Sequence, residues 1–330
     1  MSAKKIPLSL LDLVRVRQGH TPVDALAEAQ QIASHVDALG FKRYWVAEHH
    51  NFSGIASAAT SVVLAHVGQH TKNIRLGAGG IMLPNHAPYM IAEQFGTLAA
   101  IYPDRVDLGL GRAPGTDSRT LGALRIPKGA AENFANDVQE LMHWFNADAQ
   151  PLDLKAWPAT GDDAQMWLLG SSLYGATLAA ELGLPYTFAS HFAPALLDQA
   201  LDAYRSRFKP SRFLKRPHAM ISVPVVAAQT TDEAKRLFTS MQMAYSDVIR
   251  GESKPLQPPA SLSNYWRPSE LSIVERMLSI AVVGNPEEVR EGLIALQRQT
   301  DIDEFMLSTD IYDINARRNS LSLTAQVWNA

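Results

Sequence analysis

The sequence predicts an α/β protein, a (β/α)8 TIM barrel with an inserted lid segment before the last helices. Short apolar runs typical of strands alternate with helical patterns from residue 6 onward. These runs lack the polar alternation of a half-exposed sheet, which indicates parallel strands covered by helices. Eight such runs occur in 330 residues, a length within the usual range for a barrel. A doubly wound sheet is the alternative built from the same elements.

The expected elements follow one another with short connections. Thr21 and Pro22 supply an N-cap and a proline at the first position of the first helix, and Gly40 ends that helix. The strands are expected at residues 6–11, 44–47, 74–83, 106–110, 166–169, 186–189, 219–227 and 304–307. Later helices are expected at residues 58–70, 87–101, 132–145 and 173–182, between the remaining strands, and at the C-terminus.

One segment departs from this alternation. Residues 251–272 carry four prolines and few apolar residues, so we expect no regular structure there. A segment of this kind in a compact domain is typical of a lid over an active site. We predict a single domain over residues 1–330 with a mobile lid at about 251–272, called the lid segment below.

Composition excludes several classes of function. The formal net charge of -3 argues against nucleic-acid binding, which needs a concentrated basic surface. No apolar run approaches the roughly 18 residues needed to span a membrane, and no signal peptide is visible, so we expect a cytoplasmic protein. The chain has no cysteine, which excludes disulfides, thiolate metal sites and cysteine nucleophiles.

Titratable side chains gather where the second strand ends. Glu48, His49 and His50 directly follow its apolar run, and chemistry in α/β proteins collects at the carboxyl ends of strands. A structural ion pair involving Glu48 is the alternative. The third strand contains Gly77, Gly79 and Gly80. They predict a close approach of the backbone to a ligand or, equally, a bulge in the barrel.

The next two strand ends predict an anion site. Arg112 follows glycines after the fourth strand, in a run that resembles a dinucleotide fingerprint but is interrupted by Pro114. Gly170, Ser171 and Ser172 precede a helix, whose amino end offers free N–H groups to a phosphate. A surface arginine and a simple serine N-cap are the alternatives. His191 ends the sixth strand and is expected to face the same side of the barrel, although a lone histidine is more often packed.

Taken in series, these motifs give the chain a family resemblance. It resembles the bacterial luciferase-like flavin monooxygenases, a class of flavin-dependent oxidoreductases with a (β/α)8 fold. The matching blocks occur in the family's order at residues 45–50, 83–88 with 92–94, 109–112, 170–172 with 183–185, and 283–286. They span nearly the whole chain.

The resemblance implies a reduced FMN in the mouth of the barrel. His49 matches the histidine near the reactive edge of the flavin ring, and Glu48 matches the acidic residue beside the ring. Gly79 and Gly80 lie where members carry a non-prolyl cis peptide against the flavin. The family's phosphate-binding positions match Arg112, Gly170, Ser171, Ser172 and Gly175. The luciferase catalytic subunit carries a cysteine at the position of Gly111, so light emission is not expected here.

The implied activity is that of a two-component monooxygenase, which oxidises an apolar organic substrate with reduced FMN and O2. His49 would move a proton during the oxygen chemistry, and Glu48 would orient or tune it. A separate flavin reductase and a homodimer are the implied partners. Three alternatives remain open: an F420-dependent hydride-transfer enzyme, a flavin-binding protein without turnover, and a metal-dependent hydrolase using Glu48, His49, His191 and Asp12.

Overall fold

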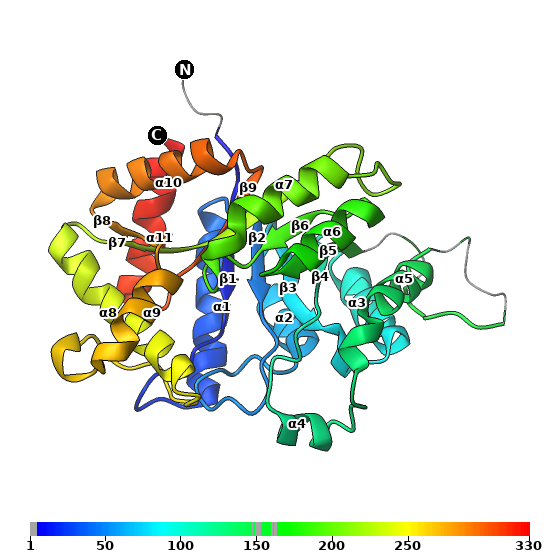
Figure 1. Ribbon diagram of the computed structural model, residues 1–330, viewed down its shortest axis with the longest axis horizontal. Helices are drawn as coiled ribbons and strands as arrows, with labels where there is room; N and C mark the ends of the chain where they lie inside the picture. The colour runs from blue at the N-terminus through cyan, green and yellow to red at the C-terminus, as the bar shows by residue number, and fades with distance from the viewer. Residues whose placement is uncertain (1–4, 147, 149–152, 160, 162–163) are drawn as a thin grey trace.

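Eight parallel strands close into a barrel, because β1 pairs with both β2 and β9 while β6 pairs with β7. The computed structural model describes every residue except 1–4, 147, 149–152, 160 and 162–163 (Figure 1). The barrel strands are β1 (Leu8–Asp12), β2 (Arg43–Val46), β3 (Arg75–Met82), β4 (Val106–Gly111), β5 (Ala164–Gly170), β6 (Tyr186–Phe188), β7 (Ala219–Ala227) and β9 (Glu304–Ser308). The predicted TIM barrel is confirmed, and the open, doubly wound sheet is excluded.

Helices cover the outside of the barrel between the strands (Figure 1). They are α1 (Pro22–Ala38), α2 (Thr60–Gly68), α3 (Pro88–Ile101), α4 (Ser118–Ala123), α5 (Phe134–Trp144), α6 (Leu173–Leu182), α7 (Leu197–Arg207), α8 (Thr231–Ile249), α9 (Pro268–Met277), α10 (Pro286–Thr300) and α11 (Ile314–Asn329). As predicted, Thr21 caps α1, and Asp24 completes a capping box. Among the described residues, no helix is both long and apolar enough to cross a membrane.

Aromatic side chains fill the interior of the barrel. The indoles of Trp45 and Trp167 meet edge to face with ring centroids 5.4 Å apart. Two of the glycines in β3 make room for them: a Cβ on Gly77 would lie 2.4 Å from Nε1 of Trp45, and one on Gly79 would lie 2.7 Å from its ring. The register of β3 against β4 also shifts between Gly79 and Ile81, so the predicted irregularity in the barrel is present.

A buried charge network lies at the amino end of the strands. Arg43 donates to Glu304 at 2.9 Å and to Asp107 at 2.8 Å, and all three side chains are almost fully buried. Arg75 and the indole of Trp45 also donate to Asp107. Because buried charges need partners, this network ties β2, β3, β4 and β9 together at the end opposite the expected site.

Two sequence-based predictions need correction. The lid segment is not devoid of regular structure: it contains a 3-10 turn, Leu262–Asn264, and the start of α9. Pro268 begins this helix instead of preventing it, because a proline at the first helical position lacks only an N–H that would be unpaired anyway. The second correction is β8 (Val282–Gly284), an unpredicted strand that pairs, within the described part of the chain, with the carboxyl end of β7 alone.

Candidate active site

The loops that follow the carboxyl ends of the strands gather on the side of the barrel opposite the chain termini (Figure 1). We call this side the barrel mouth. The helix α4 and the lid segment lie on this side, at the bottom of the view. The site residues that the resemblance implied lie near the carboxyl end of β2, β3, β4 or β5 or in the first turn of α6, whereas Asp12 ends β1 and His191 follows β6.

Glu48 is buried at the mouth and fully engaged. Its carboxylate accepts hydrogen bonds from Nε2 of His50 at 2.6 Å, from Nε2 of His86 at 2.9 Å and from the backbone N–H of Met82 at 2.9 Å. Burial alone would raise the pKa of Glu48, but the hydrogen bonds from His86 and His50 lower it below its ordinary value. Glu48 is therefore an anion held by histidines, one of which, His86, the sequence reasoning did not single out.

His49 stands apart from that cluster. None of the hydrogen bonds of the Glu48 carboxylate among the described residues reaches His49, so of the two expected effects of Glu48, orienting or tuning, the structure shows the electrostatic one. Burial and the nearby cation of Arg15 lower the pKa of His49 to about 4, while the charge of Glu48 opposes this shift. The imidazole is consequently neutral at pH 7, and its pKa is not near neutrality as an unperturbed histidine's would be.

An ion pair missed from the sequence lies beside His49. Arg15, in the loop after β1, donates two hydrogen bonds to Asp310, in the loop after β9, at 3.0 and 2.8 Å. Asp310 also acts electrostatically on His191, whose pKa burial lowers to about 4. Nδ1 of His191 is buried without a hydrogen-bond partner among the described residues, and Tyr245 donates to its carbonyl at 2.6 Å. Asp310 follows the last strand, which is the signal that could have indicated it.

The predicted anion site is assembled on the neighbouring strands β4 and β5. The guanidinium of Arg112 lies 4.3 Å from the ring centre of Tyr174, in the first turn of α6, and has no acidic partner in the described part of the chain. Ser172 is the N-cap residue of α6, yet its side chain makes no capping hydrogen bond. A free arginine and an uncapped helix amino end with a spare hydroxyl have the donor chemistry that a phosphate needs.

Glycines allow the backbones of β3, β4 and the turn before α6 to approach one another closely. The Gly79–Gly80 peptide bond is cis, as the family resemblance implied. A Cβ on Gly80 would lie 2.2 Å from the side chain of Leu169 and 2.7 Å from the carbonyl oxygen of Gly109. Gly170 and Gly175 also lie close, since a Cβ on Gly170 would be 3.7 Å from Cα of Gly175. The backbones of β3, β4 and the turn before α6 therefore approach one another and their neighbours more closely than side chains at these positions would allow.

The metal alternative does not fit this geometry. Asp12 is committed to Arg317 at 3.0 Å and to the hydroxyl of Tyr44 at 2.7 Å. Within the described residues, no three histidine, aspartate or glutamate side chains are arranged to hold a metal ion. A hydrolase built on Asp12, Glu48, His49 and His191 is therefore not supported.

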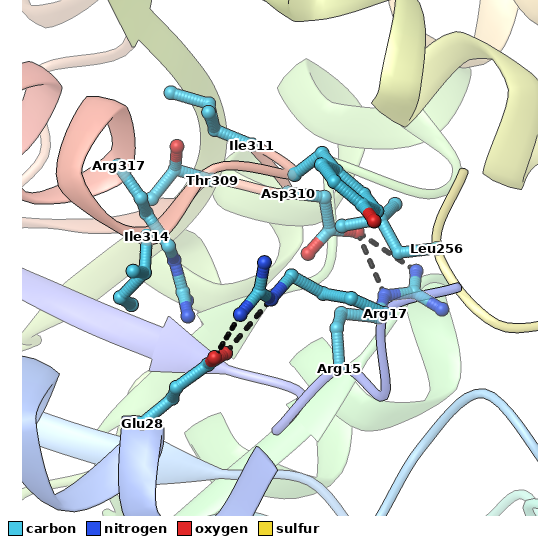
Figure 2. A pocket seen from close by; sticks show the side chains of 10 residues that line it. Arg15, Arg17, Glu28, Leu256, Thr309, Asp310, Ile311, Ile314 and Arg317 are labelled. Carbon is cyan, nitrogen blue, oxygen red and sulfur yellow. Dashed lines mark hydrogen bonds and ion pairs between the residues drawn. The ribbon is translucent and has the colours of Figure 1, made fainter. Parts of the chain in front are cut away.

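The lid segment is docked on the rim of the mouth. Leu256 accepts from the N–H of Gln18 at 2.9 Å and donates to the carbonyl of Val16 at 2.8 Å. Its buried side chain helps to line a cavity of about 10 Å³, room for a single water (Figure 2). The cavity is walled by two ion pairs drawn dashed in Figure 2, Arg15 with Asp310 and Arg17 with Glu28.

Comparison with known proteins gives a consistent result. A family model described as luciferase-like monooxygenase matches residues 7–301. A protein of Escherichia coli strain K12 named luciferase-like monooxygenase is 48% identical over 329 residues, covering 99% of this chain and 98% of the relative. The N-acetyl-S-alkylcysteine monooxygenase of Bacillus subtilis is 31% identical over 329 residues, covering 96% and 97% of the two chains.

Solved structures are similar over the whole length. The crystal structure of apo-MsnO8 has a TM-score of 0.91 and 30% identity, with 98% of each chain covered. The oxygenating constituent of 3,6-diketocamphane monooxygenase from Pseudomonas putida, solved with FMN, has a TM-score of 0.73 at 18% identity and covers 98% and 97% of the chains. An F420-dependent secondary alcohol dehydrogenase has a TM-score of 0.72 at 15% identity, with 98% of each chain covered. At these lower identities the likeness shows the fold alone.

Proposed function

The chain belongs to the luciferase-like monooxygenase family, and from that premise we propose that it is an FMN-dependent monooxygenase that uses reduced FMN and O2 to oxidise a small organic molecule. The single observation that carries this proposal is the arrangement of the β3–β5 edge. There the bare Gly79–Gly80 backbone and the free guanidinium of Arg112 lie at neighbouring strand ends, beside the amino end of α6. In our proposal this edge offers a surface for a flat ring next to a site for a phosphate.

The residues present fit FMN. Arg112, the hydroxyls of Ser171 and Ser172 and the free N–H groups of α6 would hold the phosphate, with Gly170 and Gly175 leaving space for it. Gly79 and Gly80 would lie against the ring. Bound reduced FMN supplies the activation of O2.

The protein's own contribution is proton handling and exclusion of water. As a neutral imidazole, His49 carries one N–H and one unprotonated ring nitrogen, so it can donate a hydrogen bond from the first and accept a proton at the second. The docked lid segment, anchored by its buried Leu256, would keep bulk water from the mouth. We propose that this segment opens to admit the substrate.

Two partners belong to the proposal. We propose a separate flavin reductase as the source of reduced FMN, as the family resemblance implies. We also propose a homodimer formed through α2 and α3, where Val62, Met90 and Ile101 are more than half exposed although large and apolar. Sedimentation that gives a monomer at micromolar concentration would rule the dimer out.

The cofactor can be tested directly by titration. Purified protein is titrated with oxidised FMN, with dithionite-reduced FMN and with F420, and binding is followed by fluorescence and absorbance. We expect micromolar binding of FMN, tighter in the reduced form. Arg112→Ala should weaken it by about 10- to 150-fold, because hydrogen bonds to a charged group contribute about 1.5–3 kcal/mol. The control is Arg290→Ala, which removes a surface arginine of α10.

The possible outcomes separate the candidate cofactors. Selective binding of F420 would replace oxygen chemistry by hydride transfer. Binding of neither cofactor would contradict the flavoenzyme proposal altogether.

A further inference from the structure

Glu48 is the centre of a compact cluster on β2 and β3. Its backbone N–H donates to the carbonyl of Gly80 at 3.3 Å, and its carboxylate accepts from the N–H of Met82 at 2.9 Å. One residue therefore holds the backbone on both sides of Ile81. That stretch directly follows the peptide on which the flavin ring would lie.

Two histidines complete the cluster from opposite directions. His50 comes from the same strand end as Glu48, and His86 comes from the turn that follows β3. Both donate from Nε2 to the Glu48 carboxylate, whose side chain is 1% exposed, while those of His50 and His86 are 16% and 28% exposed. A buried carboxylate is costly unless its oxygens are bonded, and these histidines supply most of that bonding.

We propose that His50 and His86 are positioning residues that act through Glu48, and that the three form a clamp fixing the Gly80–Met82 backbone in the shape that receives the flavin ring. The identity of the ring rests on the proposed function, whereas the clamp itself rests on the hydrogen bonds. The Glu48 carboxylate donates nothing to and accepts nothing from His49 in the hydrogen bonds of the clamp, so the clamp acts on the ring site through the backbone that it holds.

A second pair in the same chain provides a matched control. His218 lies 3.5 Å from the carboxylate of Glu304, which is also 1% exposed, and the His218 side chain is 31% exposed. The pair has the same residue types and similar burial as His86 with Glu48, but His218 makes no hydrogen bond to the carboxylate, and the pair lies at the amino end of the strands, away from the mouth. Loss of either histidine removes a neighbour of a buried glutamate, and only the loss of His86 should affect the ring site.

The test compares four variants: His86→Leu, His86→Gln, Glu48→Gln and His218→Leu. Glutamine at position 86 can still donate to the carboxylate, whereas leucine cannot. An amide at position 48 offers one acceptor oxygen to three donors. Each variant is measured for thermal unfolding, for FMN affinity and, without cofactor, for hydrogen exchange at the Met82 amide.

We expect His86→Leu and Glu48→Gln to weaken FMN binding about 10-fold or more and to speed exchange at Met82. His86→Gln should restore both to near the wild-type values, and His218→Leu should lower thermal stability without changing either. Wild-type affinity and exchange in His86→Leu would overturn the clamp, as would equal damage from His218→Leu.

Two further results remain decisive. If Glu48→Gln fails to fold, the comparison of His86→Leu with His86→Gln carries the test, since His86 is partly exposed. If the wild type binds no FMN, the proposed function fails. Exchange at Met82 in the cofactor-free variants then decides the clamp alone: faster exchange supports it, and unchanged exchange refutes it.

Discussion

Gly54 is the position at which a single methyl group should undock the lid segment. A Cβ built there would lie 2.0 Å from the carbonyl oxygen of Lys254 and 3.3 Å from the ring of Phe52. Nonbonded atoms in contact keep about 3.5 Å, so Gly54→Ala requires the lid segment to retreat by more than ~1 Å. Leu256 lies two residues after Lys254, so a displacement of Lys254 also disturbs the contacts that hold Leu256 in place.

The size of the expected effect follows from the contacts of Leu256, which docks the lid segment at this point. Leu256 makes two backbone hydrogen bonds, with Val16 and Gln18, each contributing about 1 kcal/mol. Its side chain is 3% exposed, and burial of a leucine contributes about 1.5–3 kcal/mol. Docking at this point is thus stabilised by roughly 3.5–5 kcal/mol. Overpacking typically costs about 1–3 kcal/mol, so Gly54→Ala should raise the undocked population about 5- to 150-fold.

Hydrogen exchange at the amides of Leu256 and Gln18 measures this population directly. Both amides should exchange faster in Gly54→Ala, and proteolysis beside Leu256 should accelerate by a similar factor. Gly122→Ala is the control, because a Cβ there meets nothing within 4 Å. Unchanged exchange at Leu256 in Gly54→Ala, or an equal change in Gly122→Ala, would refute the docked arrangement.

Three other predictions follow from buried charges and histidines. His49→Ala should increase hydrogen peroxide released per product formed, measured with a peroxide-coupled assay once a substrate is found; unchanged coupling would exclude its proton role. Arg43→Met should lower the free energy of unfolding in urea by about 3–5 kcal/mol because it breaks buried pairs, whereas Arg236→Met, at an exposed pair, should cost under about 1 kcal/mol. Equal losses would contradict this. Because the folded-state pKa values of His49 and His191 are about 4, below the ordinary 6.5, their neutral forms stabilise the fold above pH 6.5. Stability should fall as the pH drops from 6.5 to 4, and replacing both by glutamine should flatten that slope.

The strands of the barrel could be predicted because each carries its own signal. Residues 219–227 form an apolar run that is buried at every position of β7, and the run was placed with the same bounds. Thr21 and Pro22 predicted the start of α1, because their capping geometry depends only on neighbours in sequence. In contrast, β8 has three residues and pairs with one strand only, so no periodicity could reveal it.

Contacts between distant loops could not be predicted from the sequence. Arg15 and Asp310 are 295 positions apart, and neither lies in a motif. They meet because β1 and β9 are the strands that close the barrel. The lid segment was misjudged for a related reason. Its prolines indicate irregular backbone, but Pro268 initiates a helix, and Glu270 in that helix pairs with Arg250, the C-cap residue of α8, at 2.6 Å.

The cluster of Glu48, His49 and His50 shows where pattern reasoning stops short of chemistry. In an extended segment, successive side chains point to opposite sides, so residues 48 and 50 share a side and residue 49 faces away. The structure follows this rule: the Glu48 carboxylate bonds His50 and not His49. This alternation argues against a metal ion shared by Glu48 and His49. For the same reason it argues against a hydrogen bond between the two side chains. It assigns the carboxylate to the β3 backbone and leaves His49 as a neutral imidazole that feels the charge of Arg15, available for the proposed proton role.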